Sequence, residues 1–104
     1  MPLDVLNPFD QSIVCGLDYD EGPTLEAKIA AAHKAAERWR QVPLGDRIEQ
    51  VREGLERFRT ESERIAADVS RQMGKPIAQA RGEVNTVFAR ADHMLELAPE
   101  TLSP

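Results

Sequence analysis

The chain's single thiol, Cys15, is the side chain best suited to covalent catalysis, because a cysteine thiolate is a strong nucleophile. Such a thiolate forms beside a general base, a cationic group or a helix N-terminus. Cys15 instead lies between Val14 and Gly16, and acidic residues begin at Asp18, which disfavours a thiolate. Free cysteines are most often small, buried apolar residues. We therefore predict that Cys15 is a buried strand residue without a catalytic role.

The histidines and acidic residues do not form a metal-binding pattern. His33 and His93 fall on different predicted helices, and a zinc site needs three or four converging ligands. The acids within residues 18–21 resemble the start of a calcium loop, which needs Gly at its sixth position and Glu at its twelfth. Pro23 and Ile29 occupy those two positions. We predict no metal site and interpret this acidic segment as a solvated connector.

Three further features could suggest ligand binding, and each has a structural interpretation. Gly74-Lys75 lacks the earlier glycine of a phosphate-binding loop, and Pro76 replaces its Ser or Thr, so Gly74 is interpreted as a helix stop. Trp39 lies on an apolar stripe and is predicted to anchor the core. Several arginines alternate with glutamates, which is typical of a charged outer helix face, namely Arg47, Arg52, Arg57, Arg59 and Arg64.

Composition restricts the classes of protein to which the chain can belong. Its 104 residues suffice for one small domain or for part of a larger one, and its net charge is −5. This acidic excess disfavours nucleic-acid binding, which needs a basic face. The apolar runs are too short for a transmembrane helix, we expect no secretory leader, and a single cysteine fits a reducing compartment. We therefore expect a cytoplasmic protein that binds neither nucleic acid nor membrane.

The hydrophobic periodicity changes along the chain and divides it into two parts. Residues 1–22 contain two short apolar runs around the turn sequence Asn7-Pro8-Phe9-Asp10-Gln11, which predicts a β-hairpin arm. Residues 23–104 carry apolar residues at three- and four-residue steps, which predicts a helical layer. The predicted helices lie at about 24–41, 44–59, 61–73 and 76–98. The predicted fold class is mainly α with a short N-terminal β-hairpin arm.

Capping and breaking residues set the predicted helix boundaries. We expect Thr24 to cap the first helix, Gly74 to supply a left-handed stop, and Pro99 to end the last helix. Thr60 and Glu63 match a capping box, in which each side chain satisfies the other residue's backbone N–H. This pair predicts a new helix. The alternative is one long helix that joins the second and third predicted segments.

The apolar stripes need partners that this chain does not supply in full. A two-stranded hairpin is marginal on its own in water, and its unpaired edges favour packing against a larger sheet. Phe88 and Leu95 widen the apolar stripe of the last predicted helix. We therefore predict exposed apolar surface around these two side chains in the isolated chain.

Four segments of the chain carry a resemblance to a known enzyme family. They are Asn7-Pro8, then Ala31-Ala32-His33-Lys34-Ala35-Ala36-Glu37-Arg38-Trp39, then Pro43-Leu44-Gly45-Asp46-Arg47, and last Met73-Gly74-Lys75-Pro76-Ile77-Ala78-Gln79-Ala80-Arg81-Gly82-Glu83-Val84. In this order they resemble the N-terminal stretch of the aldehyde dehydrogenase superfamily. The last segment is the most specific of the four. The resemblance covers roughly residues 6–98.

Members of this superfamily oxidise aldehydes to carboxylic acids with NAD or NADP, so the resemblance implies an oxidoreductase as the parent protein. In the family the nucleophilic cysteine, the glutamate that assists hydrolysis and the cofactor-binding elements all lie downstream of the last segment. Cys15 precedes the first family helix and does not match the catalytic position. The resemblance therefore implies no catalytic, cofactor-binding or metal-binding residue in this chain.

The resemblance also implies what the chain belongs to. It would be an N-terminal, structural fragment of a larger α/β, Rossmann-like cofactor domain, and its partner would be the remainder of the polypeptide. A parent of the succinate-semialdehyde type, assembled as a homo-oligomer, is a further expectation. By itself the chain is expected to be inactive toward aldehydes.

Two other interpretations remain open from the residues alone. One is a self-contained helical bundle that binds another protein through one apolar stripe. The other, weaker one is a small metal or ligand binder. A monomeric chain that unfolds cooperatively would favour the bundle, and a measurement of its metal content would test the metal or ligand binder. A reading frame that continues past Pro104 into a Gly-rich dinucleotide segment would favour the enzyme.

Overall fold

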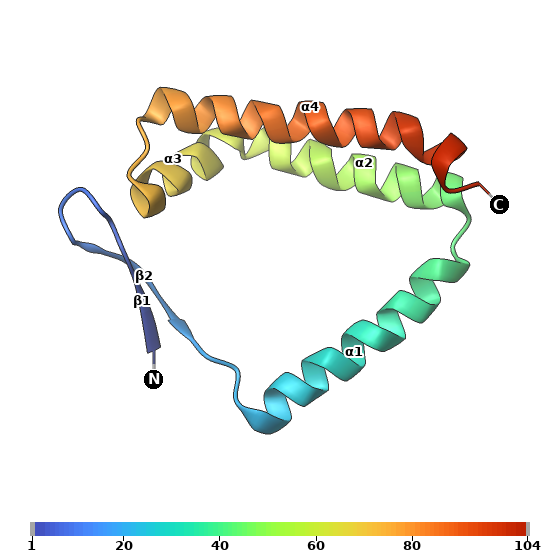
Figure 1. Cartoon of the computed structure of the whole chain (residues 1–104), viewed down its shortest axis with the longest axis horizontal. Helices are drawn as coiled ribbons and strands as arrows, with labels where there is room; N and C mark the ends of the chain where they lie inside the picture. The colour runs from blue at the N-terminus through green and yellow to red at the C-terminus, as the bar shows by residue number, and fades with distance from the viewer. Residues whose placement is uncertain (1, 104) are drawn as a thin grey trace.

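The computed structural model describes residues 2–103, which form two strands and four helices (Figure 1). In chain order they are β1 (Pro2–Leu6), β2 (Ile13–Asp18), α1 (Gly22–Gln41), α2 (Leu44–Thr60), α3 (Ser62–Met73) and α4 (Ile77–Thr101). α4 lies along α2 and α3, whereas the hairpin and α1 complete an open ring. The predicted fold class, mainly α with an N-terminal hairpin, is confirmed. Between residues 2 and 103, no helix combines the length and apolar character that a membrane span requires.

β1 and β2 form the predicted antiparallel hairpin, in which Leu3 pairs with Leu17 and Val5 with Cys15. The register shifts between Val5 and Leu6, as at a β-bulge. Within the described chain no further strand or helix covers this two-stranded sheet. Cys15 is consequently only half-buried, and the prediction of a buried thiol is wrong.

The hydrophobic core lies between α3 and α4, with a contribution from α2. Ala66 of α3 and Ala80 of α4 are fully buried, and Val84 and Phe88 of α4 are nearly so. The small alanine side chains let the two helix axes approach closely, because interaxial distance depends on the residues at the contact. Apolar side chains from α2 and α3 pack around this cluster, namely Leu55, Ile65 and Val69.

The observed helices end within three residues of the predicted boundaries, but two predicted signals act differently. α1 begins at Gly22, and Glu21 precedes it as the cap residue. Thr24 lies inside the first turn, where its N–H donates to Glu21 O at 2.9 Å, so its predicted role as N-cap is wrong. Pro23 suits this first turn because helical N–H groups have no partner there.

α4 continues through Pro99 to Thr101, so the prediction that Pro99 ends the helix is wrong. A proline removes one backbone N–H and crowds the preceding turn, and this perturbation falls in the last turn of a 25-residue helix. The N–H of Leu102 then closes that turn on Ala98 O at 2.9 Å.

The predicted helix restart after α2 is confirmed, but the predicted capping box is wrong. α2 ends at Thr60 and α3 begins at Ser62, so the alternative of one continuous helix is also wrong. The hydroxyl of Thr60 donates to Arg57 O at 2.8 Å, and α3 has no side-chain cap. Glu63, the second member of the proposed box, instead pairs with a side chain of α4.

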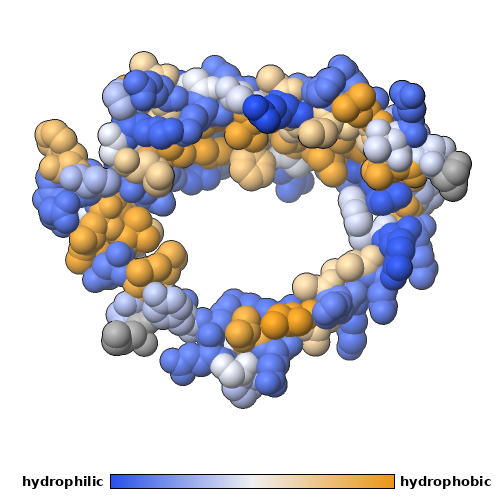
Figure 2. Space-filling view, in the orientation of Figure 1, coloured by the Kyte–Doolittle hydropathy of each residue, from blue (hydrophilic) through white to orange (hydrophobic). Residues whose placement is uncertain are grey.

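α1 carries a complete apolar stripe but buries none of it. Leu25 and Ile29 are 47% and 50% exposed, and Trp39 is 40% exposed, so the prediction of Trp39 as a core anchor is wrong. The radius of gyration is 17.8 Å, against about 13 Å for a compact chain of this length. Figure 2 shows apolar surface on the hairpin, on α1 and on the packed helices around an opening through the molecule.

The predicted exposed apolar surface on the last helix is present, but it does not lie at Phe88 and Leu95, because both side chains are buried in the described chain. Phe88 belongs to the core cluster with Ala66 of α3, and Leu95 lines a pocket with apolar side chains of α2. The exposed apolar side chains of α4 are instead on a neighbouring face and include Val87 and Met94, at 58% and 65% exposure. α4 therefore presents apolar residues on two faces, only one of which is covered.

Candidate functional site

The hairpin turn is held by its own polar side chains. Asn7 Oδ1 accepts the Phe9 N–H at 3.0 Å, and Asp10 Oδ1 accepts the Ser12 N–H at 3.0 Å and its hydroxyl at 2.6 Å. These bonds from Ser12, its hydroxyl first, lower the pKa of Asp10 below its ordinary value. Gln11 takes a left-handed conformation (φ 62°). The turn is therefore a defined structure that can make a specific contact.

The connector between α3 and α4 is equally well defined. Gly74 adopts a left-handed conformation (φ 73°) and its N–H donates to Ser70 O at 2.9 Å, which confirms its interpretation as a helix stop. The Ser70 hydroxyl donates to Lys75 O at 2.6 Å, and the Lys75 ammonium forms an ion pair with Glu83. The Ser70 hydroxyl and the Lys75 ammonium are therefore both satisfied within the chain.

The hairpin turn and this connector lie against each other. A Cβ built on Gly74 would lie 3.4 Å from the Cβ and Cγ of Pro8, so the glycine permits this approach. The two segments enclose a shallow pocket of about 360 Å³, lined by Asn7, Phe9, Ser70, Arg71, Gly74, Lys75 and Pro76. The Ser70 hydroxyl is already bonded and no base accompanies it, so we interpret this junction as a structural contact. It joins the first and last segments of the family resemblance.

Two arginines connect helices that are far apart in sequence. Arg59 of α2 donates to Asp92 of α4 at 2.6 Å, and its guanidinium carbon lies 4.7 Å from the centroid of the Phe88 ring. The hydrogen bond to Asp92 is the main reason that the pKa of Arg59 is raised. Arg59 also pairs with Glu56 at 3.0 Å. This arginine therefore fixes α4 against α2, and its guanidinium is paired with two carboxylates.

Arg81 of α4 makes a bidentate pair with Glu63 of α3. Its Nη2 lies 2.6 Å and its Nε 3.0 Å from Oε1, and Nε lies 3.1 Å from Oε2. This hydrogen bonding lowers the pKa of Glu63 and raises that of Arg81. Both side chains are more than half exposed, so solvent screens the pair. Neither this pair nor that of Arg59 leaves a charge free for catalysis.

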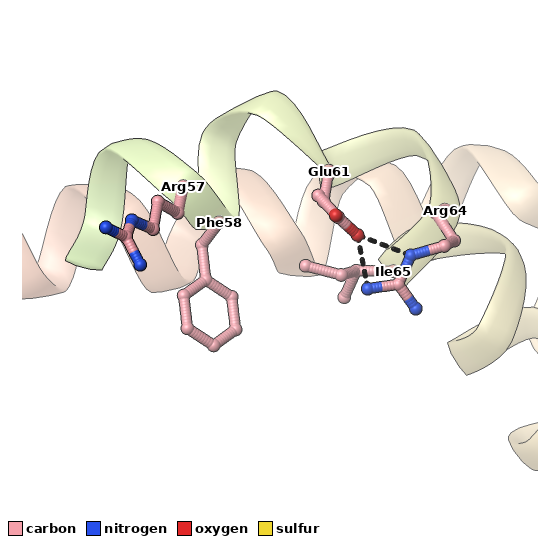
Figure 3. Close-up of a pocket in the computed structure, with 5 residues that line it drawn as sticks. All are labelled: Arg57, Phe58, Glu61, Arg64 and Ile65. Carbon is pink, nitrogen blue, oxygen red and sulfur yellow. Dashed lines mark hydrogen bonds and ion pairs between the residues drawn. The ribbon is translucent and has the colours of Figure 1, made fainter. Parts of the chain in front are cut away.

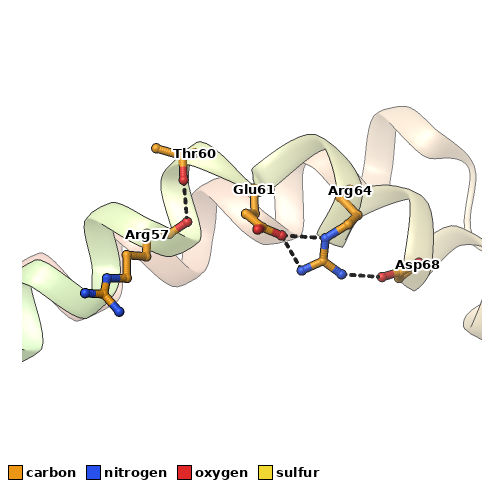
Figure 4. Close-up of polar contacts among 5 residues, drawn as sticks. All are labelled: Arg57, Thr60, Glu61, Arg64 and Asp68. Atoms are coloured by element: carbon orange, nitrogen blue, oxygen red, sulfur yellow. Dashed lines mark hydrogen bonds and ion pairs between the residues drawn. The ribbon is translucent and has the colours of Figure 1, made fainter.

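A pocket of about 210 Å³ lies at the joint between α2 and α3 (Figure 3). Phe58 and Ile65 form its apolar part, and Arg57, Glu61 and Arg64 its polar part. Glu61 forms an ion pair with Arg64, which also reaches Asp68 at 3.2 Å (Figure 4). Ion pairs between exposed side chains three or four residues apart on a helix contribute little to the free energy of unfolding. The pocket holds no nucleophile, and its one carboxylate, Glu61, is already paired with Arg64.

The two histidines lie on different helices, as predicted. His33 lies on α1 and His93 on α4, and both are exposed. Within residues 2–103, no three side chains of His, Cys, Asp or Glu gather in a way that could hold a metal ion. Asp18, Asp20 and Glu21 are exposed, and Lys28 of α1 pairs with Asp20 at 2.6 Å.

The connector between β2 and α1 does not fit a dinucleotide phosphate. β2 is followed by a helix, the order that such sites use, but the last residue of β2, Asp18, and the connector residues Asp20 and Glu21 are acidic. These carboxylates repel a pyrophosphate. Pro23 also removes one of the N–H groups that the first turn of α1 would offer. The connector between β2 and α1 is therefore a poor site for a dinucleotide phosphate.

A hairpin and four amphipathic helices, with motifs that meet at one junction and with apolar faces left open, describe one part of a larger fold. The chain matches the Aldehyde dehydrogenase family over residues 1–103. It belongs to the aldehyde dehydrogenase family.

Several curated relatives are similar to this chain. It is 30% identical over 97 residues to succinate semialdehyde dehydrogenase [NAD(P)+] of Escherichia coli, covering 93% of this chain and 21% of that protein. It is 26% identical over 103 residues to succinate-semialdehyde dehydrogenase [NADP(+)] of Deinococcus radiodurans, covering 99% of this chain and 22% of that protein.

A third relative, N-succinylglutamate 5-semialdehyde dehydrogenase of Novosphingobium aromaticivorans, is 35% identical over 68 residues, covering 65% of this chain and 14% of that protein. The chain thus spans between 14% and 22% of the length of these three relatives.

Proposed function

We propose that this chain is the N-terminal, structural segment of an NAD(P)-dependent aldehyde dehydrogenase, with its open apolar faces covered by the remainder of the polypeptide. In this role it supplies packing surface, and the reacting groups come from the rest of the protein. No residue of the chain is assigned to catalysis, cofactor binding or metal binding.

The observation that carries this proposal is the exposure of the whole apolar stripe of α1. A helix of 20 residues with an apolar stripe ordinarily gains its stability by burying that stripe. Among the described residues nothing covers Leu25 or Ile29. A self-contained bundle would bury this helix against the others, so the observed arrangement supports a segment of a larger fold.

The substrate class is part of the same proposal. The Escherichia coli and Deinococcus radiodurans relatives are named for succinate semialdehyde, and their names include NAD(P)+ and NADP(+). We assign an aldehyde of this short, acidic type and either nicotinamide cofactor to the parent enzyme. A homo-oligomeric parent and a cytoplasmic location belong to the proposal too, the latter supported by an unpaired, partly accessible thiol.

A chimera tests this proposal directly. The matching segment of the Escherichia coli relative is replaced by residues 1–103 of this chain, and oxidation of succinate semialdehyde is followed by cofactor reduction. We expect a folded enzyme with measurable turnover. An inactive or insoluble chimera would contradict the proposal, because the segment would then not replace its counterpart.

Two variants of the chimera separate the apolar stripe from the rest of α1. Ile29→Gln introduces a polar group into the stripe and should reduce the yield of active enzyme. Lys34→Gln lies on the opposite side of the helix, half a turn from the stripe, and serves as the matched control. Equal losses in both variants would show that α1 is not covered through its stripe.

The 104-residue chain alone is expected to show no NAD(P)-dependent aldehyde oxidation. Its thiol has no base beside it, and the connector between β2 and α1 does not fit a dinucleotide phosphate. Turnover by the isolated chain that is abolished in Cys15→Ala would overturn the structural role proposed here.

A further inference from the structure

A second apolar pocket, of about 160 Å³, lies at the corner where α1 meets α2 and where α4 ends. Trp39 comes from α1, and apolar side chains of α2 and of the end of α4 complete the walls, namely Leu44, Ile48, Val51, Leu95, Ala98 and Leu102. Arg47 is the one charged residue of this lining. The pocket therefore combines three helices with a single cation.

Arg47 differs from the other arginines that contact neighbouring helices. Its Nε is buried and has no hydrogen-bond partner among the described residues. Arg59 and Arg81, by contrast, are both paired with carboxylates of other helices. A buried N–H without an acceptor is costly, and a charged one especially so. The geometry therefore lacks an acceptor at this point.

We propose that this pocket receives a segment of polypeptide in which an Asp or Glu side chain stands next to an apolar residue. The carboxylate pairs with the Arg47 guanidinium, and the apolar side chain lies against Trp39. This inference rests on the proposed function, in which the remainder of the polypeptide supplies the segment. Arg47 then acts as a positioning residue for the contact between this chain and its partner.

Charge and surroundings both favour an acidic polypeptide segment. The only charge of the lining is positive, and guanidinium groups bind carboxylates through directed N–H donors. The apolar surface also extends beyond the pocket, since Trp39, Val51 and Leu102 are each at least 40% exposed. A segment with neighbouring side chains can cover this margin, which a small carboxylate cannot.

The pocket is large enough for one apolar side chain. A cavity of about 150 Å³ is known to accept a benzene molecule, and this pocket has a similar size. Two matched peptides therefore serve as probes, acetyl-Leu-Asp-Leu-amide and acetyl-Leu-Asn-Leu-amide, which differ only in the charge of the central side chain. Phenylacetate serves as a small carboxylate without a peptide chain.

The experiment is a titration of the full 104-residue chain, observed through the fluorescence of Trp39, the only tryptophan. We expect the Asp peptide to shift the emission to shorter wavelength and to bind about tenfold more tightly than the Asn peptide. Arg47→Met keeps the aliphatic bulk and should remove this discrimination. Arg52→Met, on an exposed part of the same helix, should leave it unchanged.

Three results would overturn the inference, namely no binding of the Asp peptide, equal binding of both peptides, and discrimination that survives Arg47→Met. Binding of phenylacetate without the Asp peptide would also overturn it, because the occupant would then be a small carboxylate. These failures are distinct from failure of the proposed function. An active chimera would leave the family role intact even if neither peptide binds.

Discussion

Two halves of this molecule obey the same sequence rules and reach opposite outcomes. α2, α3 and α4 pack part of their apolar surface into a common core, whereas β1, β2 and α1 leave theirs outside it. Both halves have regular amphipathic periodicity, so local sequence does not explain the difference. The difference is one of partners. The packed half finds them within the chain, and under the proposed function the remainder of the polypeptide supplies those of the open half.

The largest expected effect is a loss of stability, which should be large for one phenylalanine, Phe88, and small for another, Phe58. Phe88 is 6% exposed in the core, and Phe88→Ala should destabilise the packed half by about 3–5 kcal/mol. Because five apolar side chains are buried among residues 2–103, this loss approaches the whole stability of a small domain. Chemical denaturation followed by circular dichroism measures the change.

Phe58 of α2 provides the matched control, because its ring is 57% exposed. Phe58→Ala should cost well under half as much as the Phe88 substitution. Equal losses at both positions would contradict the observed core, since they would require Phe58 to be buried as well.

The next largest effect is a change in the free energy of unfolding, which has opposite signs at two glycines. Gly74→Ala forces a side chain into a left-handed conformation and against Pro8, and should cost about 1–2 kcal/mol. Gly54→Ala lies within α2, where an added Cβ meets nothing within 4 Å, and should stabilise by about 0.5–1 kcal/mol. Thermal unfolding of both variants checks these signs. A stabilising Gly74→Ala would show that the hairpin does not lie on the α3–α4 connector.

A smaller effect depends on pH. The pKa of Glu63 is lowered in the folded chain by Arg81, so its contribution is present above the ordinary value of 4.5 and is lost as pH falls through the lowered value. Glu63→Gln should therefore lower the melting temperature at pH 7, and the gap to the unmodified chain should narrow at pH 3. Glu100→Gln, at an exposed position of α4, is the control. A gap that is independent of pH would contradict the Glu63–Arg81 pair.

The smallest effect on stability is expected on α1. Ile29 is half exposed, so Ile29→Gln in the isolated chain should leave the unfolding free energy nearly unchanged while reducing the binding of a hydrophobic dye. A polar substitution in a buried stripe would instead lower the unfolding free energy and would not reduce dye binding. A clear loss of stability would show that α1 packs on the remainder of the chain in solution.

Much of the fold could be predicted because its signals are local. The turn around Asn7, the stop at Gly74 and the spacing of each apolar stripe depend on residues a few positions apart. These signals gave the hairpin, the four helices and the helix restart near residue 61. The family resemblance came from the same short segments.

The errors arose where the outcome depends on tertiary contacts. Trp39 and Cys15 were predicted to be buried on the assumption that each stripe has a cover, and Phe88 and Leu95 were predicted to be exposed for want of one. The pair of Arg59 with Asp92 spans 33 residues, and no periodicity indicates it. The unpartnered Nε of Arg47 was missed for the same reason, because alternating charge suggested a solvated face.

Hydrogen exchange of α1 tests most directly whether its face is built for a partner outside this chain. Amide protection is measured in the isolated 104-residue chain and again in the chimera with the Escherichia coli relative. We predict that α1 exchanges rapidly in the isolated chain while α3 and α4 are protected, and that α1 becomes as protected as α4 in the chimera. Strong protection of α1 in the isolated chain, or none in a folded chimera, would contradict this conclusion.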